Sequence, residues 1–282
     1  MYIPIKQPLE QLILNTFRLS GVHSVHGRIF GSGFIAKQHT EGKGEDFFLV
    51  TNRHVVEGTS QIECQLANVS GQFPNSCVLK GTTKMFASDP VRGWFAHPDP
   101  AVDVAVYRLP RDRRFVDGSE ARLDYSTIST TVFAGSSEDI DLSSEIIFVG
   151  YPSGMIDVKT ASPIFRAGSI ATPLSLDWGG KREFLIDASV FPGSSGSPVF
   201  KVADKGQVRF IGKEVKFLGL VTETMQFNAK GEFVSDKVPV SAKQAVSFKD
   251  YLNLGVVTKA ACVEETIIAV LGGGLRPVSS TN

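Results

Sequence analysis

One segment of the chain, PGSSGSP at 192–198, places three serines among glycines and prolines just before an apolar run. A serine hydroxyl is a weak nucleophile near neutral pH and needs an adjacent base to take its proton. A neutral imidazole can accept that proton and return it to a leaving group, and a carboxylate can hold the imidazole in the correct tautomer. Nucleophilic chemistry at this turn therefore requires a histidine and an acidic residue from elsewhere in the chain.

Two other segments supply these residue types beside apolar runs. In LVTNRHVV, His54 follows a run typical of a strand, and in VDVAVYRL, Asp103 precedes one. Taken singly, His54 reads as an ordinary surface or core residue, Asp103 as a capping residue and GSSGSP as a flexible loop. His97 and Asp99, in HPDPAVD, compete for the same roles, but His97 lies only six residues before Asp103 and lacks the strand-end position of His54.

Together the three segments resemble the chymotrypsin-like, or trypsin-fold, serine protease family. Its nucleophile motif, Gly-x-Ser-Gly-[Gly/Ser]-Pro, matches GSSGSP with Ser195 as the nucleophile, and the order His54, Asp103, Ser195 is the family's order. Asp103 also fits the family pattern Asp-[Ile/Val]-Ala better than Asp99 does. IDASVFPGSSGSPVF and VGYPSG resemble the bacterial high-temperature-requirement branch and related stand-alone trypsin-like peptidases. The resemblance covers residues 25–225.

The resemblance implies a serine endopeptidase that works through an acyl-enzyme with a His54–Asp103–Ser195 triad. In the family, the N–H of the nucleophile and that of the residue two before it form the oxyanion hole, which implies Gly193 and Ser195 here. Position 194 is Ser, where animal digestive members carry an Asp that pairs with a newly cut N-terminus. We therefore expect no activation by N-terminal cleavage, and expect control by loop ordering or by a regulatory or activating protein partner.

The resemblance also suggests how a polypeptide substrate is held. The family position six before the nucleophile is the pocket floor, and here it is Ser189. A basic side chain would find no fixed countercharge there, so we expect a small or medium apolar residue before the scissile bond. Thr222 occupies a family position whose hydroxyl supports the acid, and we expect it to donate to Asp103. The backbone of Glu223 and Thr224 would pair with an extended substrate as an added strand.

The elements that must position these residues are predominantly strands. Short runs rich in Val, Ile and Phe recur between Gly, Pro, Asn and Ser, with no long helical pattern between them. The runs are RIFGSGFIA (28–36), FFLVTN (47–52), QIECQLA (61–67), VDVAVYRL (102–109), EIIFVGYP (145–152), EFLIDASV (183–190), SPVF (197–200) and FLGLVTETM (217–225). Periodicity and capping predict helices at 8–19 (PLEQLILNTFRL) and 258–271 (TKAACVEETIIAVL).

We therefore expect an all-β protein with two six-stranded antiparallel β-barrels, as in the chymotrypsin-like fold, and with N- and C-terminal helices. The expected domains are an N-terminal helix and lead-in at 1–24, a first barrel carrying His54 and Asp103 at 25–125, an interbarrel linker at 126–144, a second barrel carrying Ser195 at 145–250, and a C-terminal helix and tail at 251–282.

Composition argues against several other function classes. The chain has 29 basic and 29 acidic residues, so its zero net charge gives no basis for binding nucleic acid or an anionic membrane. The absence of an 18-residue apolar run and of a signal-peptide pattern leads us to expect a cytoplasmic protein. Cys64 and Cys77 could pair across a hairpin, but with Cys262 they are more simply three reduced thiols. We expect no metal and no cofactor.

Two other functions compete with the protease. An α/β-hydrolase esterase needs Gly-x-Ser-x-Gly before a helix and the order Ser, acid, His. Here position 197 is Ser, Pro198 opposes an immediate helix, and the order is reversed. A catalytically silent trypsin-fold binding or regulatory module would keep the same motifs, because a sequence cannot show an assembled site. A latent protease that a partner switches on lies between these alternatives.

Overall fold

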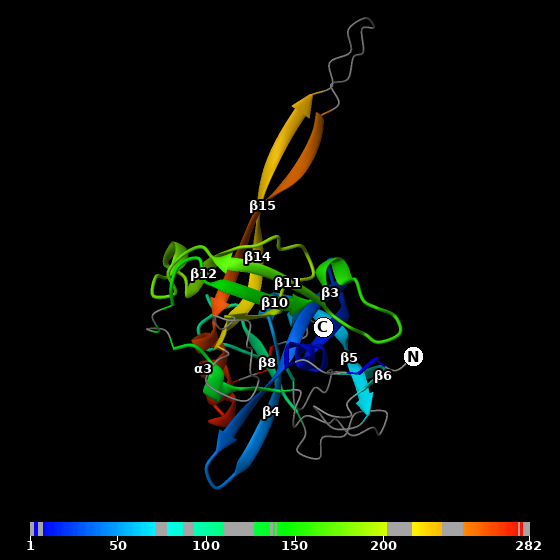
Figure 1. Ribbon diagram of the computed structural model, residues 1–282, viewed down its shortest axis with the longest axis vertical. Helices are drawn as coiled ribbons and strands as arrows, with labels where there is room; N and C mark the ends of the chain where they lie inside the picture. Colours follow the sequence, from blue (N-terminus) through cyan, green and yellow to red (C-terminus); the bar gives the residue numbers. More distant parts are fainter. Residues whose placement is uncertain are drawn as a thin grey trace, which may run out of the picture.

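A computed structural model describes residues 3–4, 8–70, 78–86, 93–109, 127–135, 138, 140–201, 216–232, 245–275 and 277–278. These residues form two β-rich halves with few helices (Figure 1), which confirms the expected all-β, chymotrypsin-like fold. The strands of the N-terminal half are β1 (Ile3–Pro4), β2 (Thr16–His23), β3 (Gly27–Thr40), β4 (Gly44–Thr51), β5 (Thr59–Ser70), β6 (Val78–Phe86), β7 (Phe95–Ala96), β8 (Ala105–Arg108) and β9 (Ile128–Ser129). Those of the C-terminal half are β10 (Glu145–Gly150), β11 (Ile164–Ile170), β12 (Glu183–Asp187), β13 (Pro198–Lys201), β14 (Lys216–Glu232) and β15 (Ala245–Lys259).

The N-terminal half is one nine-stranded sheet. Its order is β1-β6-β5-β2-β3-β4-β8-β7, and β9 pairs in parallel with β3. Among the described strands this sheet is a continuous path, whereas we expected a closed barrel of six strands. The additional strands include β2 and β6, which the apolar runs did not reveal, and three two-residue strands that are too short for any run to mark. Part of the expected interbarrel linker thus belongs to the sheet through β9.

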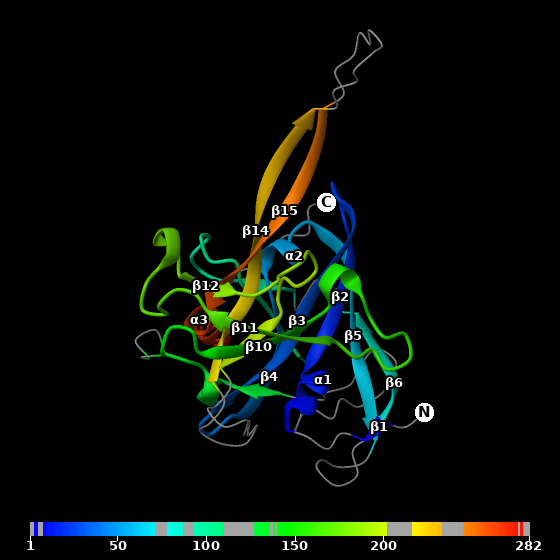
Figure 2. The ribbon, with the colours of Figure 1, turned by 45° about the horizontal axis from the view of Figure 1, so that its top comes forward.

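The C-terminal half is a closed barrel, as expected. Its six strands follow the order β10-β11-β12-β15-β14-β13, and every pair is antiparallel. β15 crosses the expected boundary at residue 250 and closes the barrel between β12 and β14. Beyond the barrel, β14 and β15 continue as a long two-stranded ribbon as far as the pair Glu232 and Ala245 (Figures 1 and 2).

The N-terminal helix is shorter than the sequence predicts. Residues Pro8–Gln11 form a 3-10 turn, α1 covers only Leu12–Asn15, and β2 follows at once. Phe17 and Leu19 are both buried in β2, because side chains two apart share a face of a strand. Pairing of β2 with β3 and β5 therefore overrides the helical spacing in this segment. The C-terminal helix is confirmed as α3 (Ala260–Leu271).

A hydrophobic cluster shared by both halves holds them together. Phe34 of β3 and Phe217 of β14 are fully buried, with ring centroids 5.0 Å apart, and Ile267 of α3 belongs to the same cluster. Two further clusters fill the N-terminal half and the barrel separately. The shared core fixes one half against the other, which matters because the predicted catalytic residues come from both.

The described cysteines are consistent with reduced thiols. Cys64 and Cys262 are buried and free, and Cys77 lies outside the described residues. Burial raises the pKa of Cys262 to about 11, so this thiol stays protonated at neutral pH. Within the described part of the chain, no helix has the length and apolar character needed to cross a membrane.

Candidate active site

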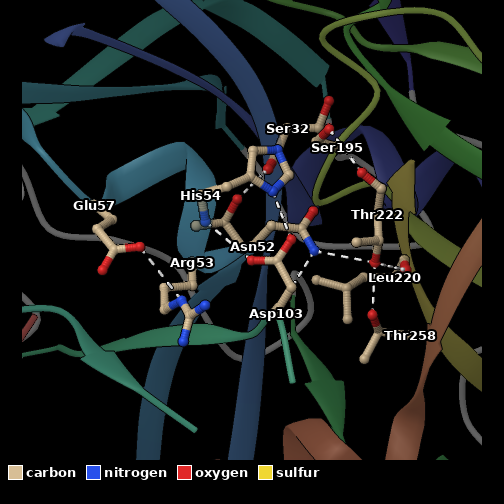
Figure 3. A network of polar contacts seen from close by, with 11 residues as sticks. Ser32, Asn52, Arg53, His54, Glu57, Asp103, Ser195, Leu220, Thr222 and Thr258 are labelled. Carbon is tan, nitrogen blue, oxygen red and sulfur yellow. Dashed lines mark hydrogen bonds and ion pairs between the residues drawn. The ribbon is translucent and has the colours of Figure 1, made fainter. Parts of the chain in front are cut away.

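His54 and Asp103 form a hydrogen-bonded pair in the N-terminal half. β4 ends at Thr51, Asn52 continues the chain in an extended conformation, and α2 (Arg53–Val56) is a single turn that carries His54. Nδ1 of His54 lies 2.5 Å from Oδ2 of Asp103, and the backbone N–H of His54 donates to Oδ1 (3.0 Å). Nδ2 of Asn52 donates to the backbone carbonyl of Asp103 (2.8 Å) and so fixes the backbone of the acid (Figure 3).

The environment of Asp103 keeps its carboxyl group ionised. Burial alone would raise its pKa, but the hydrogen bonds and charge of His54, together with the nearby Arg53 guanidinium, bring the pKa below its ordinary value. The His54 side chain is half exposed, whereas that of Asp103 is only 20% exposed. Because the carboxylate engages Nδ1, Nε2 is the ring nitrogen that can act as a base.

The turn that carries Ser195 is held by β3 of the other half. The backbone N–H of Ser32 donates to the carbonyl of Ser195 (2.8 Å). The Ser32 hydroxyl donates to the carbonyl of Gly193 (2.9 Å) and accepts from the N–H of Tyr151 (2.9 Å). Gly196 has φ +87° and passes so close to Ser32 that a Cβ would collide with the Ser32 carbonyl oxygen. Glycine is required at 196 for this close approach between the halves.

Two backbone amides of this turn, those of Gly193 and Ser195, have no acceptor among the described residues. The preceding carbonyl, that of Pro192, is occupied because it accepts from the N–H of Ser153 (2.6 Å). Gly193 itself has φ +87°, a left-handed conformation that glycine adopts without strain. A pair of free N–H groups beside a serine hydroxyl is the arrangement that stabilises the oxyanion of acyl transfer.

Burial distinguishes Ser195 from the other serines of the turn. Ser194 is 1% exposed and Ser197 is fully buried, and neither hydroxyl has a hydrogen-bond partner among the described residues. Ser195 is partly exposed. Of the three, only the hydroxyl of Ser195 can meet an external substrate.

The hydroxyl of Ser195 is not bonded to His54. It donates to the backbone carbonyl of Thr222 (3.2 Å), and within the described residues no hydrogen bond joins it to the imidazole. Figure 3 shows the ring of His54 between Asp103 and Ser195. The structure thus brings the three predicted residues to one site, with the acid–base pair formed and the base–nucleophile bond not formed. Catalytic hydrogen bonds are often long or misaligned before a substrate binds.

The expected hydrogen bond from Thr222 to Asp103 is wrong. The Thr222 hydroxyl lies 2.6 Å from that of Thr258 and 3.3 Å from the carbonyl of Leu220. It also accepts from Nδ2 of Asn52 (3.2 Å), the same amide group that donates to the backbone of Asp103. Thr222 therefore supports the acid only through Asn52, a residue that sequence reasoning did not single out.

The residues predicted to bind substrate lie on the C-terminal barrel. Ser189 is partly buried, and its hydroxyl donates to Oδ1 of Asn253 (2.9 Å). Glu223 is exposed, and Thr224 follows it on β14. β13 pairs with β14 only as far as Leu220, so that edge of β14 has no described strand partner at Glu223 and Thr224. Their roles in substrate binding stay predictions.

A cleft of about 430 Å³ lies beside the His54–Asp103 pair. It is lined by Arg53, His54, Glu57, Ala101, Asp103, Lys181, Glu183, Thr222 and Glu223. Sequence reasoning missed Glu183, which reads as an ordinary polar residue at the start of a strand. It also missed Ser32, because nothing in the run RIFGSGFIA marks one serine as a contact between the halves.

The competing histidine has a different role. His97 is buried, and its Nε2 lies 3.2 Å from Oε2 of Glu265 on α3. Glu265 also forms a bidentate ion pair with Arg182, with Nη1–Oε2 and Nη2–Oε1 distances of 2.5 and 2.6 Å. His97 therefore ties the loop before Asp103 to the C-terminal helix and is not part of the candidate triad.

Comparison with known proteins identifies the family of this chain. The family model described as "Trypsin-like peptidase domain" matches residues 31–209. A curated relative, "Probable periplasmic serine endoprotease DegP-like" of Halomonas elongata, is 26% identical over 198 residues, which are 68% of this chain and 31% of the relative. The chain therefore spans less than a third of the length of that relative.

One solved structure supports the fold, and a second shows only a weaker similarity. The structure titled "HtrA-type protease AlgW with tripeptide" has a TM-score of 0.53 at 15% identity, over 95% of this chain and 64% of that one. The inactive form of Rv3671c from M. tuberculosis H37Rv has a TM-score of 0.49 at 17% identity, over 98% of this chain and all of that one. The chain thus belongs to the trypsin-like peptidase domain family and has a chymotrypsin-like fold.

Proposed function

We propose that this chain is a serine endopeptidase that cleaves polypeptides through an acyl-enzyme. Nε2 of His54 takes the proton of Ser195 as Oγ bonds to the scissile carbonyl carbon, while Asp103 stabilises the imidazolium. The N–H groups of Gly193 and Ser195 stabilise the oxyanion. His54 then protonates the departing amine as the C–N bond breaks, and a water molecule, deprotonated by His54, hydrolyses the ester and restores Ser195.

One observation carries this proposal: the His54–Asp103 pair lies beside the one partly exposed serine of a turn that presents two free backbone amides. A base oriented by an acid, a nucleophile and an oxyanion site are the components that acyl transfer needs. A protein that only binds a partner would not need an oriented base, a nucleophile and an oxyanion site at one place.

The Ser195 hydroxyl has an orientation that we interpret as the inactive, resting state of this enzyme. Its bond to the Thr222 carbonyl must be given up, by rotation about Cα–Cβ, before His54 can receive the proton. We include in the proposal that a substrate, or a regulatory or activating protein partner, favours this rotation. A catalytically silent binding or regulatory module is the second candidate, because the same bond would hold the hydroxyl away from the base permanently.

The expected substrate lies extended along the open edge of β14. The residue before the scissile bond faces Ser189, whose hydroxyl carries no charge, so small or medium apolar side chains fit it best. The name of the curated relative places that protein in the periplasm. A cytoplasmic location for this chain stays a prediction.

Hydrolysis of fluorescently labelled casein tests the function, with the wild type, Ser195→Ala and His54→Ala compared at equal concentration. The proposal predicts turnover by the wild type that either substitution reduces by several orders of magnitude, as triad replacements do in an unrelated protease. Labelling by a fluorophosphonate distinguishes a latent protease from a catalytically silent binding module. A latent enzyme still reacts, slowly, whereas absence of labelling with and without substrate peptides supports the silent module.

A further inference from the structure

Glu183, at the start of β12, is a largely buried residue whose carboxylate reaches the surface and has no partner among the described residues. The residue is only 7% exposed, and its side chain makes no hydrogen bond or ion pair with the described residues. It lines the cleft beside His54 and Asp103, so its carboxylate is accessible from that cleft. Buried carboxylates are rarely left unpaired, because removal from water is costly without a compensating charge. This one therefore points to a cationic group that enters from outside.

The other charges of the cleft leave it negative. Of its two cations, Arg53 lies 3.4 Å from Glu57, and Lys181 is exposed at the rim. Glu183 and Glu223 face the cleft in addition to the Asp103 carboxylate, which His54 engages. Among the described residues that line the cleft, the two carboxylates of Glu183 and Glu223 are thus opposed only by Lys181.

The surroundings of Glu183 raise its pKa, which is the direction expected for a cleft with excess negative charge. Burial raises its pKa, and although Lys181 lowers it, Glu223 and Asp103 raise it further. The surroundings of Glu183 therefore disfavour its ionised form compared with that of a carboxyl group in water. A second positive charge would relieve both the desolvation and the repulsion between neighbouring carboxylates.

The geometry of an extended substrate brings alternate side chains to this cleft. Successive side chains of a strand point to opposite faces. If the residue before the scissile bond faces Ser189, the residue before that one points away from Ser189. It then faces His54 and the cleft that contains Glu183 and Glu223.

We infer that this cleft binds a basic side chain, Lys or Arg, of the polypeptide substrate, two residues before the scissile bond, with Glu183 as the buried acceptor and Glu223 as the exposed one. This inference rests on the proposed function for its substrate and register. With this cleft, the enzyme would prefer substrates that carry a basic residue followed by a small or medium apolar residue directly before the scissile bond. The selection comes from pairing a largely desolvated carboxylate that has no partner among the described residues.

Peptide binding to the full chain carrying Ser195→Ala tests the inference without any cleavage. The probes are two fluorescein-labelled heptapeptides, one alternating Ala with Lys and the other alternating Ala with norleucine. Alternation places every Lys on one face, so each register that puts Ala at Ser189 brings a Lys to the cleft, and a shift of two residues restores this arrangement. We expect the Lys peptide to bind about tenfold more tightly by fluorescence anisotropy, a ratio that a single partly buried charge pair can supply.

Further substitutions in the Ser195→Ala background locate the acceptor. Glu183→Gln should abolish the preference for Lys, and Glu223→Gln, at an exposed position where folding is safe, should weaken it. Lys181→Met should strengthen it by removing the competing cation. Glu145→Gln, an exposed carboxylate at the start of β10, is the matched control and should leave the ratio unchanged.

The outcomes separate the inference from the proposed function. Equal affinity for the two peptides, or a ratio that Glu183→Gln leaves intact, would overturn the inference. If Glu183→Gln does not fold, an unchanged ratio in Glu223→Gln overturns it instead. Fluorophosphonate labelling of the wild type is measured separately and tests the nucleophile alone. Loss of labelling therefore argues against the endopeptidase, whereas loss of Lys selectivity with normal labelling argues against the cleft assignment only.

Discussion

Replacing Ser32 with alanine removes two hydrogen bonds that cross from the first half of the molecule to the second. The fully buried hydroxyl donates to the carbonyl of Gly193 and accepts from the N–H of Tyr151, both at 2.9 Å. Alanine leaves the buried N–H of Tyr151 and the partly buried carbonyl of Gly193 without that partner. A fully buried group left unpaired costs about 1–3 kcal/mol and a partly buried one less, so we expect a loss of about 2–4 kcal/mol in the free energy of unfolding. That is a large part of the roughly 5–15 kcal/mol that stabilises an ordinary domain.

Urea unfolding followed by tryptophan fluorescence measures this loss. Ser169→Ala is the matched control, because Ser169 lies on β11, is partly exposed and has no side-chain hydrogen bond among the described residues. It should change stability by less than about 0.5 kcal/mol. Ser32→Ala should also slow fluorophosphonate labelling under conditions where it is fully folded, because the Gly193 peptide loses its anchor. A variant as stable and as reactive as the wild type would refute the role given to this hydroxyl.

Three further substitutions test other parts of the site. Asp103 has a native pKa below its ordinary value of about 3.9, so its stabilising contribution is present above that pH and is lost as the pH falls through the native pKa. Asp103→Asn should therefore destabilise the protein at pH 7, and the gap to the wild type should close on acidification in thermal melts. Glu183 has a raised native pKa, so its charge destabilises the fold above that pKa and ceases to do so below about pH 4.3. Glu183→Gln should raise the melting temperature at pH 8, with a gain that shrinks as the pH falls; a constant gain would argue against a buried charge. Gly196→Ala should fail to give folded, active protein in gel filtration and casein assays, because its Cβ collides with the backbone of Ser32.

The sequence was sufficient to predict the parts of the site that depend on residue type and local context. His54 after a strand, Asp103 before one and Ser195 between glycines were all singled out, and the structure places them at one site (Figure 3), while their catalytic roles stay predictions. The strands that carry them were predicted too, because Val, Ile and Phe runs bounded by Gly and Pro are strong local signals.

What the sequence did not reveal depends on contacts between distant segments. Ser32 and Asn52 matter because of what lies opposite them across the two halves, and no local pattern records that. Thr222 was assigned a bond to Asp103, but the register shift in β14 between Val221 and Glu223 comes at this residue, and its hydroxyl meets Thr258 and Asn52 instead. Glu183 looked like a solvated strand residue because burial by neighbouring elements is invisible in one chain.

The N-terminal segment shows the same limit for secondary structure. The spacing of apolar residues in 8–19 fits a helix, yet the same residues also fit an alternating strand from Thr16 onward. Pairing with β3 and β5 decides between the two readings. The local pattern therefore predicted correctly where the helical segment begins, at Pro8, but not where it ends, at Asn15.

Mass-spectrometric mapping of a fluorophosphonate adduct tests the central claim most directly. The turn offers three serines within four residues, and only Ser195 combines exposure with two free amides and a neighbouring imidazole. The account predicts a single adduct on Ser195 that is absent in Ser195→Ala and strongly reduced in His54→Ala. An adduct on Ser194 or Ser197, or labelling that His54→Ala leaves at the wild-type rate, would contradict it.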